Sequence, residues 1–529
     1  MLALLCALAA VRVGVVNDMT PPANGVDEII IVDDAADSAP SEAQVETQPS
    51  LLNEGSRTLL TFGLSSRFLL DASLEFTGED VVEWWNLGTL RLEHRHGELL
   101  KAVVEAAVRW GMVGEEPIDD PFVGFNPRDV KWTGDVELRE AYLQWRRGGI
   151  EARVGQQIFV WGKNEVCAAA DVLNSVDLRY DPTAMLDSPK NLKVPVFAFD
   201  LGWWWESWGV QLVIIPFFTP HRGTLVGRDF SLAPSGSELE EQIGAVGKFN
   251  PTIEDEIQSA VWGTEVPDEA PWESSVALRA QGNVAGWDFA GTVYNGWDRT
   301  PRLRVDSDLL VLLDSAERIL GNPELTVTDP VLRDATLAVQ QKSLVGEELV
   351  RARYRRMWRL ALEAQGVLGD VVVRGDIGFS PEQTFYTTDF APIGLPSVLG
   401  SLGLEYTRGE TWYVSVTGYA VAAMDAPKDA LLSGLESATV DPQNRGAAVL
   451  YGVSSTVRWR WQEQGLVVST TGLYNIAPGD HVLSFETAYD DFEPHTFIAG
   501  AVFINGPAGT TGRTYRNNDF VYLGYSGTW

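Results

Sequence analysis

The sequence Asn-Asp-Phe-Val-Tyr-Leu-Gly-Tyr-Ser-Gly-Thr-Trp, residues 518–529, is the segment that most restricts the possible architecture. Successive side chains of an extended strand alternate sides. Four large apolar side chains of this stretch therefore share one face: Val521, Leu523, Tyr525 and Trp529. An amphipathic strand that ends on an aromatic residue needs a neighbour along its open edge, and a sheet that closes on itself supplies one. The same face contains Gly527, where a bulky apolar residue is more usual.

The composition of the 529 residues favours alternating strands over helices that cross a membrane. Beyond the N-terminus no run of 18 apolar residues occurs, so no membrane-spanning helix is predicted. The mean hydropathy is near zero, although the chain has 19 Trp, 14 Tyr and 21 Phe. Strands with one face toward lipid and the other toward water produce this combination.

Charge and cysteine content exclude several classes of function. The net charge is −33, whereas a nucleic-acid-binding protein needs basic patches. Only Cys6 and Cys167 occur, so neither a disulfide framework nor a zinc cluster is predicted. We expect no cofactor and no bound metal. None of the five histidines forms a recognisable motif with a serine, so we expect no enzyme.

The N-terminal region predicts export rather than fold. Residues 1–10 are apolar and end in small residues, which predicts an atypical signal peptide cleaved near residue 9 or 10; a buried helical turn is the alternative. Residues 11–57 are acidic and rich in Ala, Pro and Ser, which predicts a disordered periplasmic leader. Within it, residues 26–34 are either an apolar patch or a segment that contacts an energy-coupling partner.

From Thr58 onward, alternating segments of about ten residues recur. We predict eighteen strands, at 58–70, 84–94, 99–111, 135–146, 150–161, 193–204, 207–217, 273–283, 287–297, 351–365, 369–380, 398–408, 411–423, 447–462, 465–476, 480–489, 494–504 and 518–529.

Short and long connectors alternate between these strands. The short ones are polar or contain glycine, as hairpin turns do, and both termini lie at their end. Residues 477–479 are the exception, because this link is short where a long one is due. The pattern is typical of an outer-membrane barrel, with turns in the periplasm and long loops outside. The sequence therefore predicts an all-β fold: a transmembrane up-and-down antiparallel barrel over residues 58–529, with eighteen strands or, as the alternative, sixteen.

Strand parity assigns the side chains to a lipid face and a lumen face. An arginine on the lipid face near the middle of the membrane costs roughly 2–4 kcal/mol, which favours charged side chains on the lumen face. The predicted lumen residues are Lys101, Glu105, Arg109, Glu140, Arg146, Arg353, Arg355, Arg359, Glu363, Arg374, Asp376, Glu405, Arg458 and Arg460. They either bind charged solutes or pair with one another to hold the barrel's shape. The excess acid lies in the leader and in the long connectors, mainly residues 218–272.

A barrel of eighteen strands is wide enough for an aqueous channel unless a connector folds into it. Residues 162–192 are the predicted constriction, and an external loop with helical turns is the alternative. The candidate constriction charges are Lys163, Glu165, Asp171, Asp177 and Arg179.

Three parts of the sequence resemble known proteins. The C-terminal strand resembles the signal by which the outer-membrane assembly machinery recognises its clients. Trp161-Gly162, followed by Asp171-Val-Leu-Asn174 and Asp177-Leu178, is similar to a motif of an uncharacterised porin-like outer-membrane family, with Ser175 where that family has proline. Residues 503–507 and 517–522 resemble the same family. The resemblance implies a passive or substrate-specific pore.

We therefore expect a porin-like channel for small polar or charged solutes in the outer membrane of a Gram-negative bacterium. Its alternatives are an outlet for a hydrophobic or polymeric substrate that works with an inner-membrane exporter, a surface scaffold or adhesin, and a barrel enzyme. The expected partners are outer-membrane lipid, the assembly machinery, periplasmic chaperones and a small solute. A homo-oligomer is a further alternative.

Overall fold

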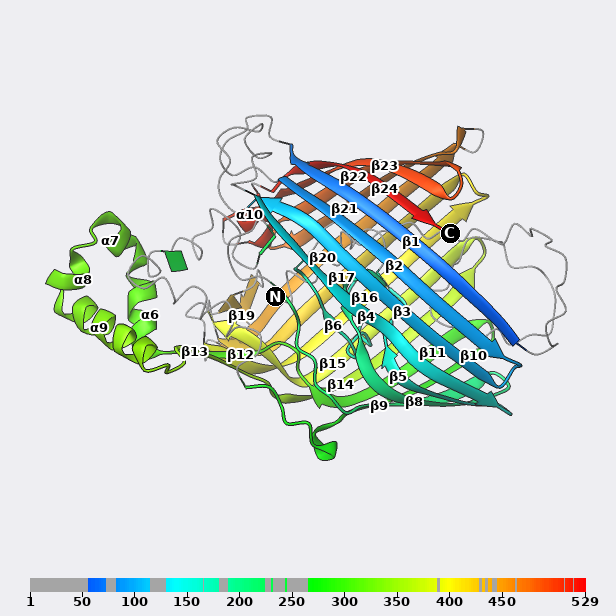
Figure 1. Ribbon diagram of the computed structural model, residues 1–529, viewed down its shortest axis with the longest axis horizontal. Coiled ribbons are helices and arrows are strands. Elements are labelled where there is room, and N and C mark those ends of the chain that lie inside the picture. Colours follow the sequence, from blue (N-terminus) through cyan, green and yellow to red (C-terminus); the bar gives the residue numbers. More distant parts are fainter. Residues whose placement is uncertain are drawn as a thin grey trace.

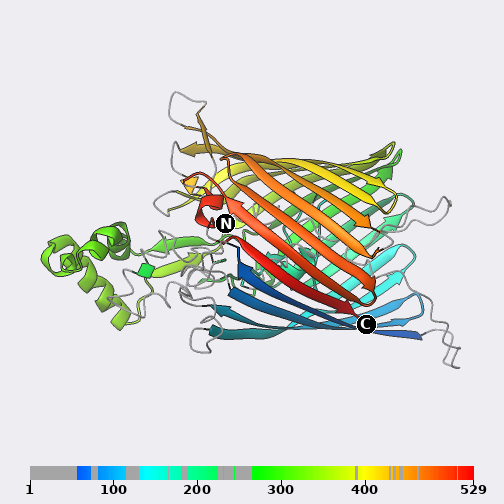
Figure 2. The same cartoon turned by 90° about the horizontal axis from the view of Figure 1, so that it is seen from above.

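The computed structural model is a closed antiparallel β-barrel with a helical arm at one end (Figures 1 and 2). The described residues are 56–72, 82–114, 130–164, 166–179, 189–223, 230–231, 243–244, 265–387, 391–427, 431–432, 436–439, 445–461, 464–508, 510–516 and 518–529. The predicted signal peptide and almost all of the predicted leader lie outside these ranges. Among the described residues, no helix is long and apolar enough to cross a membrane.

Eighteen strands form the wall, and each pairs antiparallel with the next. They are β1 (Ser56–Asp71), β2 (Val82–His96), β3 (Leu100–Gly114), β4 (Val130–Arg147), β5 (Ile150–Gln157), β8 (Val196–Trp205), β9 (Trp208–Ile215), β10 (Ser275–Val284), β11 (Trp287–Trp297), β14 (Arg356–Leu368), β15 (Val371–Thr387), β16 (Pro392–Arg408), β17 (Trp412–Pro427), β20 (Arg445–Trp461), β21 (Leu466–Ala477), β22 (His481–Phe492), β23 (His495–Asn505) and β24 (Phe520–Thr528). The prediction of eighteen strands is confirmed, and the alternative of sixteen is wrong.

The barrel closes where its last strand meets its first. β24 pairs with β1 from Gly63 opposite Thr528 to Asp71 opposite Phe520. Beyond the ladder, Phe62 and Trp529 exchange both backbone hydrogen bonds at 2.8 Å. The neighbour that the C-terminal strand requires is therefore β1, as predicted.

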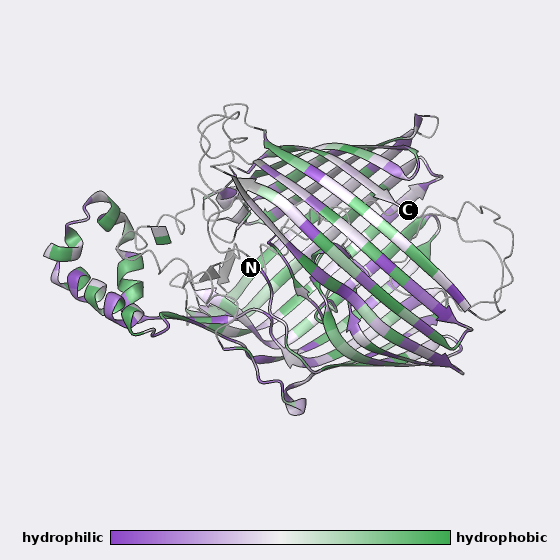
Figure 3. Cartoon of the chain, viewed as in Figure 1, coloured by the Kyte–Doolittle hydropathy of each residue, from purple (hydrophilic) through white to green (hydrophobic). Residues whose placement is uncertain are grey.

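Burial alternates along the strands as the parity argument requires. In β14, Trp358, Leu360 and Leu362 are exposed, whereas Arg359 and Glu363 are buried. Figure 3 shows hydrophobic and hydrophilic residues alternating along the wall in the same way. A strand with one apolar and one polar face forms where each face meets a different environment.

The connectors differ at the two ends of the barrel, which we name the short-turn end and the long-connector end. Gly148 and Gly149 adopt positive φ angles of 59° and 78° in the turn between β4 and β5, a conformation that glycine permits without strain. Several strand boundaries differ from the prediction. β5 ends at Gln157, β14 begins only at Arg356, and most of the predicted loop 381–397 belongs to β15 and β16.

Short strands and helices lie outside the wall ladder or extend it. These are β6 (Ser175–Val176), β7 (Lys193–Val194), β12 (Arg302–Val305), β13 (Val350–Arg353), β18 (Leu431–Leu432), β19 (Glu436–Thr439), α3 (Pro189–Leu192), η2 (Pro271–Glu273), α6 (Ser307–Asp314), α7 (Ala316–Gly321), α8 (Leu325–Thr328), α9 (Pro330–Leu344) and α10 (Thr511–Thr514).

The helical arm comprises α6–α9 and stands on the ribbon of β12 and β13 at the long-connector end (Figure 1). Its helices pack around their own apolar core, which includes Leu309, Leu312 and Leu332. Asp306 caps α6, and Asp329 caps α9 ahead of Pro330. The sequence predicted only a long connector here.

Candidate functional site

The chain between β5 and β8 crosses the interior of the barrel. We call its described residues, 158–164, 166–179 and 189–195, the crossing segment. The backbone N–H groups of Lys163 and Asn164 donate to the Asp376 carboxylate on β15, at 3.2 and 2.7 Å. The Asn164 side chain donates to Ser401 Oγ on β16 at 3.0 Å. Five strands (β8, β9, β10, β11 and β14) separate β5 from β15 along the wall, so the segment must run across the lumen.

The contact with β15 and β16 is close. A Cβ atom added at Gly403 of β16 would lie 2.5 Å from the Asn164 side-chain oxygen, so any larger residue there would have to displace this amide. Deeper in the segment, Phe159, Trp161 and Leu173 belong to one buried apolar cluster with side chains of β8–β11, β14, β16, β17, β20 and β21. The first part of the crossing segment, residues 158–164 and 166–174, is therefore fixed mainly by burial of apolar surface.

Polar side chains pin the two ends of this first part together. Asn174 accepts a hydrogen bond from the Phe159 N–H at 2.7 Å and donates one to the Val194 carbonyl at 2.8 Å. Lys193 donates to the Phe159 carbonyl at 2.6 Å and forms an ion pair with Asp171. Asp171 and Asn174, which carry the resemblance noted above, thus tie the segment's start to its end.

Ser175 explains why proline is absent at its position. Its hydroxyl donates to the Thr219 carbonyl at 2.5 Å and accepts from the Arg299 guanidinium at 2.8 Å. The same guanidinium donates to the Thr219 carbonyl at 2.7 Å, to the Val172 carbonyl at 3.4 Å, and to the Leu173 carbonyl. We call this set of contacts the Arg299 clamp. Burial lowers the pKa of Arg299, because the charged form loses its hydration there.

His221 holds the next residue of the crossing segment. Its Nδ1 accepts a hydrogen bond from the Val176 N–H at 2.9 Å, which requires an unprotonated Nδ1. Burial, followed by the nearby positive charge of Arg299, lowers the pKa of His221 to about 3. The imidazole is therefore neutral at pH 7.

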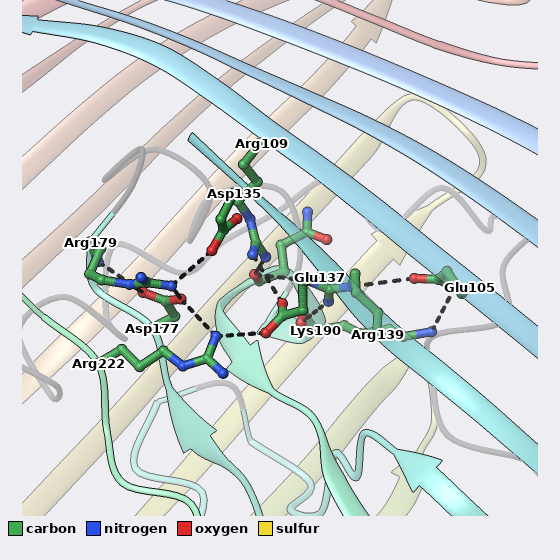
Figure 4. A network of polar contacts seen from close by, with 10 residues as sticks. Glu105, Arg109, Asp135, Glu137, Arg139, Asp177, Arg179, Lys190 and Arg222 are labelled. Atoms are coloured by element: carbon green, nitrogen blue, oxygen red, sulfur yellow. Dashed lines mark hydrogen bonds and ion pairs between the residues drawn. The ribbon is translucent and has the colours of Figure 1, made fainter. Parts of the chain in front are cut away.

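The last part of the crossing segment, residues 176–179 and 189–193, faces a wall of charges on β2–β4, which we call the charged wall (Figure 4). Asp177 pairs with Arg179 at 2.7 Å, and Arg179 also reaches Asp135 of β4 at 3.1 Å. Arg222 donates to Glu137 at 2.7 Å. Charges of the connectors and of the barrel wall therefore alternate in sign across this contact.

A second group of ions lies farther along the same wall. Arg139 is only 1% exposed and reaches Glu105 at 3.3 Å and the Lys190 carbonyl at 2.5 Å. Arg91 contacts both Glu105, at 2.8 Å, and Glu140, at 2.5 Å. Lys190 donates to Glu140 at 2.8 Å. Each carboxylate thus accepts from more than one cation, which offsets the cost of burial.

Arg109 of β3 also belongs to the charged wall and contacts α3. It donates to Glu137 at 3.1 Å and to the Asn191 carbonyl at 3.0 Å. Lys101 pairs with Glu93 at 3.3 Å, nearer the short-turn end. Arg146 is exposed beside the β4–β5 turn.

The remaining predicted lumen residues lie on other strands. Glu363 pairs through both oxygens with Arg279 of β10, at 2.8 and 2.9 Å, and Arg279 also stacks 5.1 Å over the Trp161 ring. Arg374 pairs with Glu405 at 2.6 Å. The other contacts are Arg359 with Gln383 at 3.2 Å, Arg458 over the Tyr413 ring at 5.2 Å, and Arg460 with Asp490 at 2.5 Å.

Two predicted lumen arginines need correction. Arg353 belongs to β13, outside the wall, and pairs with Glu265; 59% of its side chain is exposed. Arg355 follows β13, pairs with Glu382 and is half exposed. The alternation of the arm's ribbon continues that of β14, so parity alone could not separate them. Of the predicted constriction charges, Glu165 lies outside the described residues, whereas Lys163, Asp171, Asp177 and Arg179 belong to the crossing segment.

Sequence reasoning missed several residues of the site. Arg91 and Arg279 lie within predicted strands and could have been found by extending the parity argument to them. Arg139 could not, because a β-bulge opposite Glu105 turns both Arg139 and Glu140 inward. Lys190, Arg222 and Arg299 lie in connectors, where no periodicity places a side chain.

The aromatic neighbours of Gly527 in β24 explain why a glycine occupies this position. Val521, Leu523 and Trp529 are exposed on the outer face. Tyr525 accompanies them and shares a hydrogen bond with His495 at 2.8 Å. A Cβ atom at Gly527 would lie 2.7 Å from the Trp529 ring and 2.8 Å from the Tyr525 hydroxyl. A larger residue at position 527 would therefore displace the ends of these aromatic side chains.

Within the described residues, no group of three or more His, Cys, Asp or Glu side chains is arranged to hold a metal ion. No protein-family model matches the chain, and no curated protein matches its sequence. Among solved structures, it is similar to Acinetobacter baumannii OccAB3, at 10% identity over 89% of this chain and 99% of that one, with a TM-score of 0.45.

Two further solved structures show comparable similarity. Pseudomonas aeruginosa OccK2 (OpdF), in complex with glucuronate, is 9% identical over 89% of this chain and 96% of that one, with a TM-score of 0.43. Salmonella typhi OmpF, in complex with daunomycin, is 8% identical over 90% and 99%, with a TM-score of 0.39. Similarity at this level transfers neither solute nor mechanism to this chain.

Proposed function

We propose that this protein is a porin-like channel of the Gram-negative outer membrane, narrowed by the crossing segment. The observation that carries the proposal is the contact of Lys163 and Asn164 with Asp376, which brings one connector across the interior of a closed barrel. A barrel of this size encloses an aqueous lumen, and a segment across it sets the width of the passage.

The outer surface supports a membrane location. Exposed apolar side chains such as Leu92, Leu143 and Leu362 point away from the interior on strands around the barrel. Aromatic side chains gather at the short-turn end, where Trp412, Trp459 and Trp461 stack in sequence. An apolar band edged by aromatic residues is what a lipid bilayer requires. The short-turn end then faces the periplasm, and the arm lies outside the cell.

The charged wall supports passage of small polar or charged solutes. Its cations and carboxylates are paired, so a solute that exchanges one partner for another need not leave a buried charge uncompensated. We assign the pore lining to the predicted lumen residues that lie on wall strands, and we add Arg91 and Arg139. Arg353 and Arg355 are no longer part of it. No catalytic role is assigned.

Single-channel recording in planar bilayers tests this proposal. We expect discrete ion-conducting steps from protein whose folded state is verified by heat-dependent mobility on gels. Replacing Arg109 with Ala should lower the permeability of anions relative to cations, measured by the reversal potential in a salt gradient. The matched control is Arg353→Ala, which removes an arginine outside the wall. Folded barrels that never conduct would contradict the proposal.

The helical arm favours a second candidate, recognition at the cell surface. It has its own core, and it exposes Val327, Leu344 and Val345 at its surface. A barrel without conductance whose arm binds cells or a surface polymer would support this reading instead. The two functions are compatible in one molecule.

A further inference from the structure

We infer that the helical arm controls the position of the crossing segment, with Arg299 as the positioning residue between them. The inference rests on the proposed channel function. The inferred coupling links the helical arm, at the surface, to the crossing segment, which sets the width of the passage.

The arm is a single body. Lys342, near the end of α9, donates to both carboxylate oxygens of Asp306, at 2.8 and 2.7 Å, and to Asp308 at 2.8 Å. Asp306 also caps the first turn of α6. The first and last helices of the arm are therefore fastened together directly above the ribbon of β12 and β13. Their shared core adds to this connection, so a displacement of the helices must reach the ribbon.

The base of the ribbon is attached to β15 at two places. Glu382 pairs with Arg302, at 3.1 Å, and with Arg355. The Tyr386 hydroxyl accepts from the Leu303 N–H at 3.0 Å and donates to the Pro301 carbonyl. Both segments at the base of the arm, one at the start of β12 and one after β13, are thus attached to β15.

Asp298 and Arg299 continue this base into the lumen. The Asp298 N–H donates to the Arg355 carbonyl at 2.7 Å, and its carboxylate accepts from the Thr384 N–H at 3.0 Å. The next residue, Arg299, forms the clamp on the crossing segment. Only Thr300 and Pro301 separate Arg299 from Arg302, the first residue of the ribbon. The clamp and the base of the arm therefore belong to one short segment that is hydrogen-bonded to β15.

The contacts of the Arg299 clamp allow both an engaged and a released state. The hydrogen bonds of the guanidinium include three to carbonyls and one to a hydroxyl, all of them neutral, and the carboxylates of Asp171 and Asp298 act on it through their charge. Burying the guanidinium among mainly neutral groups costs much of its hydration free energy. Moving it into water restores that hydration, which offsets the hydrogen bonds that are lost. A small displacement of the base can therefore shift the balance between an engaged and a released clamp.

A double-mutant cycle on the full-length protein tests the coupling. One variant replaces residues 306–349 with Asn-Gly, a two-residue turn that rejoins Val305 to Val350 and preserves the ribbon. The second is Arg299→Gln, and the third combines both changes. We expect each single change to alter the ratio of open to closed dwell times at least about fivefold. The double variant should then match Arg299→Gln, because the arm acts only through that residue.

Arg351→Gln is the matched control, since Arg351 lies in the same ribbon and pairs with Glu348 within the arm. It should leave the dwell times unchanged. The inference is overturned if shortening the arm has no effect, or if its effect is the same in the Arg299→Gln background as in the natural sequence.

Hydrogen exchange provides a readout that does not depend on conduction. In detergent micelles, the amides of residues 172–178 should exchange faster in the shortened-arm variant and in Arg299→Gln than in the natural protein and in the control. Unchanged protection in the shortened-arm variant would overturn the coupling even if the barrel conducts. A natural protein that never conducts, with exchange that responds as expected, would contradict the channel and leave the coupling in place.

Discussion

The first part of the crossing segment, residues 158–164 and 166–174, and its last part, residues 176–179 and 189–193, are held by different chemistry. The first part buries Phe159 and Trp161 in an apolar cluster that spans many strands. The last part meets the charged wall through pairs such as Arg179 with Asp135. Burial of apolar surface changes little with pH and with moderate salt, whereas ion pairs that reach water change with both. The apolar contacts of Phe159 and Trp161 should therefore hold their end of the constriction when pH or salt changes, while the end that meets the charged wall responds to both.

Loss of Trp161 would break the fixed end, and we expect the largest effect there. Trp161→Ala removes a buried aromatic side chain and the ring beneath Arg279, at a cost of about 3–5 kcal/mol. The temperature at which the barrel unfolds on gels should fall, and the unitary conductance should rise. Trp272→Ala is the control, because that side chain is 80% exposed. Equal effects of the two changes would remove the distinction between a fixed and a responsive end.

The charged wall should respond in selectivity more than in stability. Arg139→Met takes one cation from Glu105, which retains Arg91, so we expect a cost of about 1.5–3 kcal/mol. The lumen gains negative charge, and cation permeability should rise in reversal-potential measurements. Glu105→Gln should shift selectivity in the opposite direction. Shifts of the same sign from both variants would show that the wall acts through shape alone.

Acid should loosen the last part of the segment through His221. Its pKa is about 3 in the folded protein, below the ordinary value of 6.5, so the unfolded chain binds the proton more readily. The stability that His221 contributes is complete above pH 6.5 and declines as the pH falls toward 3. Lowering the pH from 7 to 5.5 should cost about 1.4 kcal/mol.

Exchange of the Val176 amide, which donates to His221, measures this effect directly. Its protection should fall with acid in the natural protein. In His221→Asn, where the side chain accepts the bond but does not titrate, protection should vary much less with pH. Equal pH dependence in the two proteins would assign the response to other groups.

The smallest effect should come from the arginines outside the wall. Arg353 forms an exposed pair with Glu265, and such pairs add little because water screens them. Arg353→Ala should therefore leave conductance, selectivity and unfolding temperature unchanged. A change in selectivity comparable to that of Arg109→Ala would return Arg353 to the pore lining.

Local periodicity predicted the barrel and much of its inner face. The parity of β3 separates buried Glu105 and Arg109 from exposed Val104 and Val108, because alternation is a property of each strand alone. The same rule fails at Arg139, where a β-bulge adds a residue. It also fails at Arg353, because the β12–β13 ribbon has the same alternation as the wall strand β14 that follows it. Both failures depend on pairing partners that alternation does not encode.

The crossing segment was predicted as a constriction from length and charge, but its contacts could not be. The bonds from Lys163 and Asn164 to Asp376 join residues more than 200 positions apart. The Arg299 clamp likewise joins two connectors that have no periodicity of their own. Contacts of this kind depend on the closed shape of the barrel, which exists only after the strands have paired.

The pairing of β1 with β24 has a consequence for the order of folding. Each of these strands keeps an unpaired edge until the two ends of the chain meet, however complete the strands between them are. The time for which both edges stay open is set by the slowest hairpin anywhere along the wall. A substitution far from the seam that delays one hairpin should therefore increase aggregation during assembly, even if it leaves the finished barrel as stable as before.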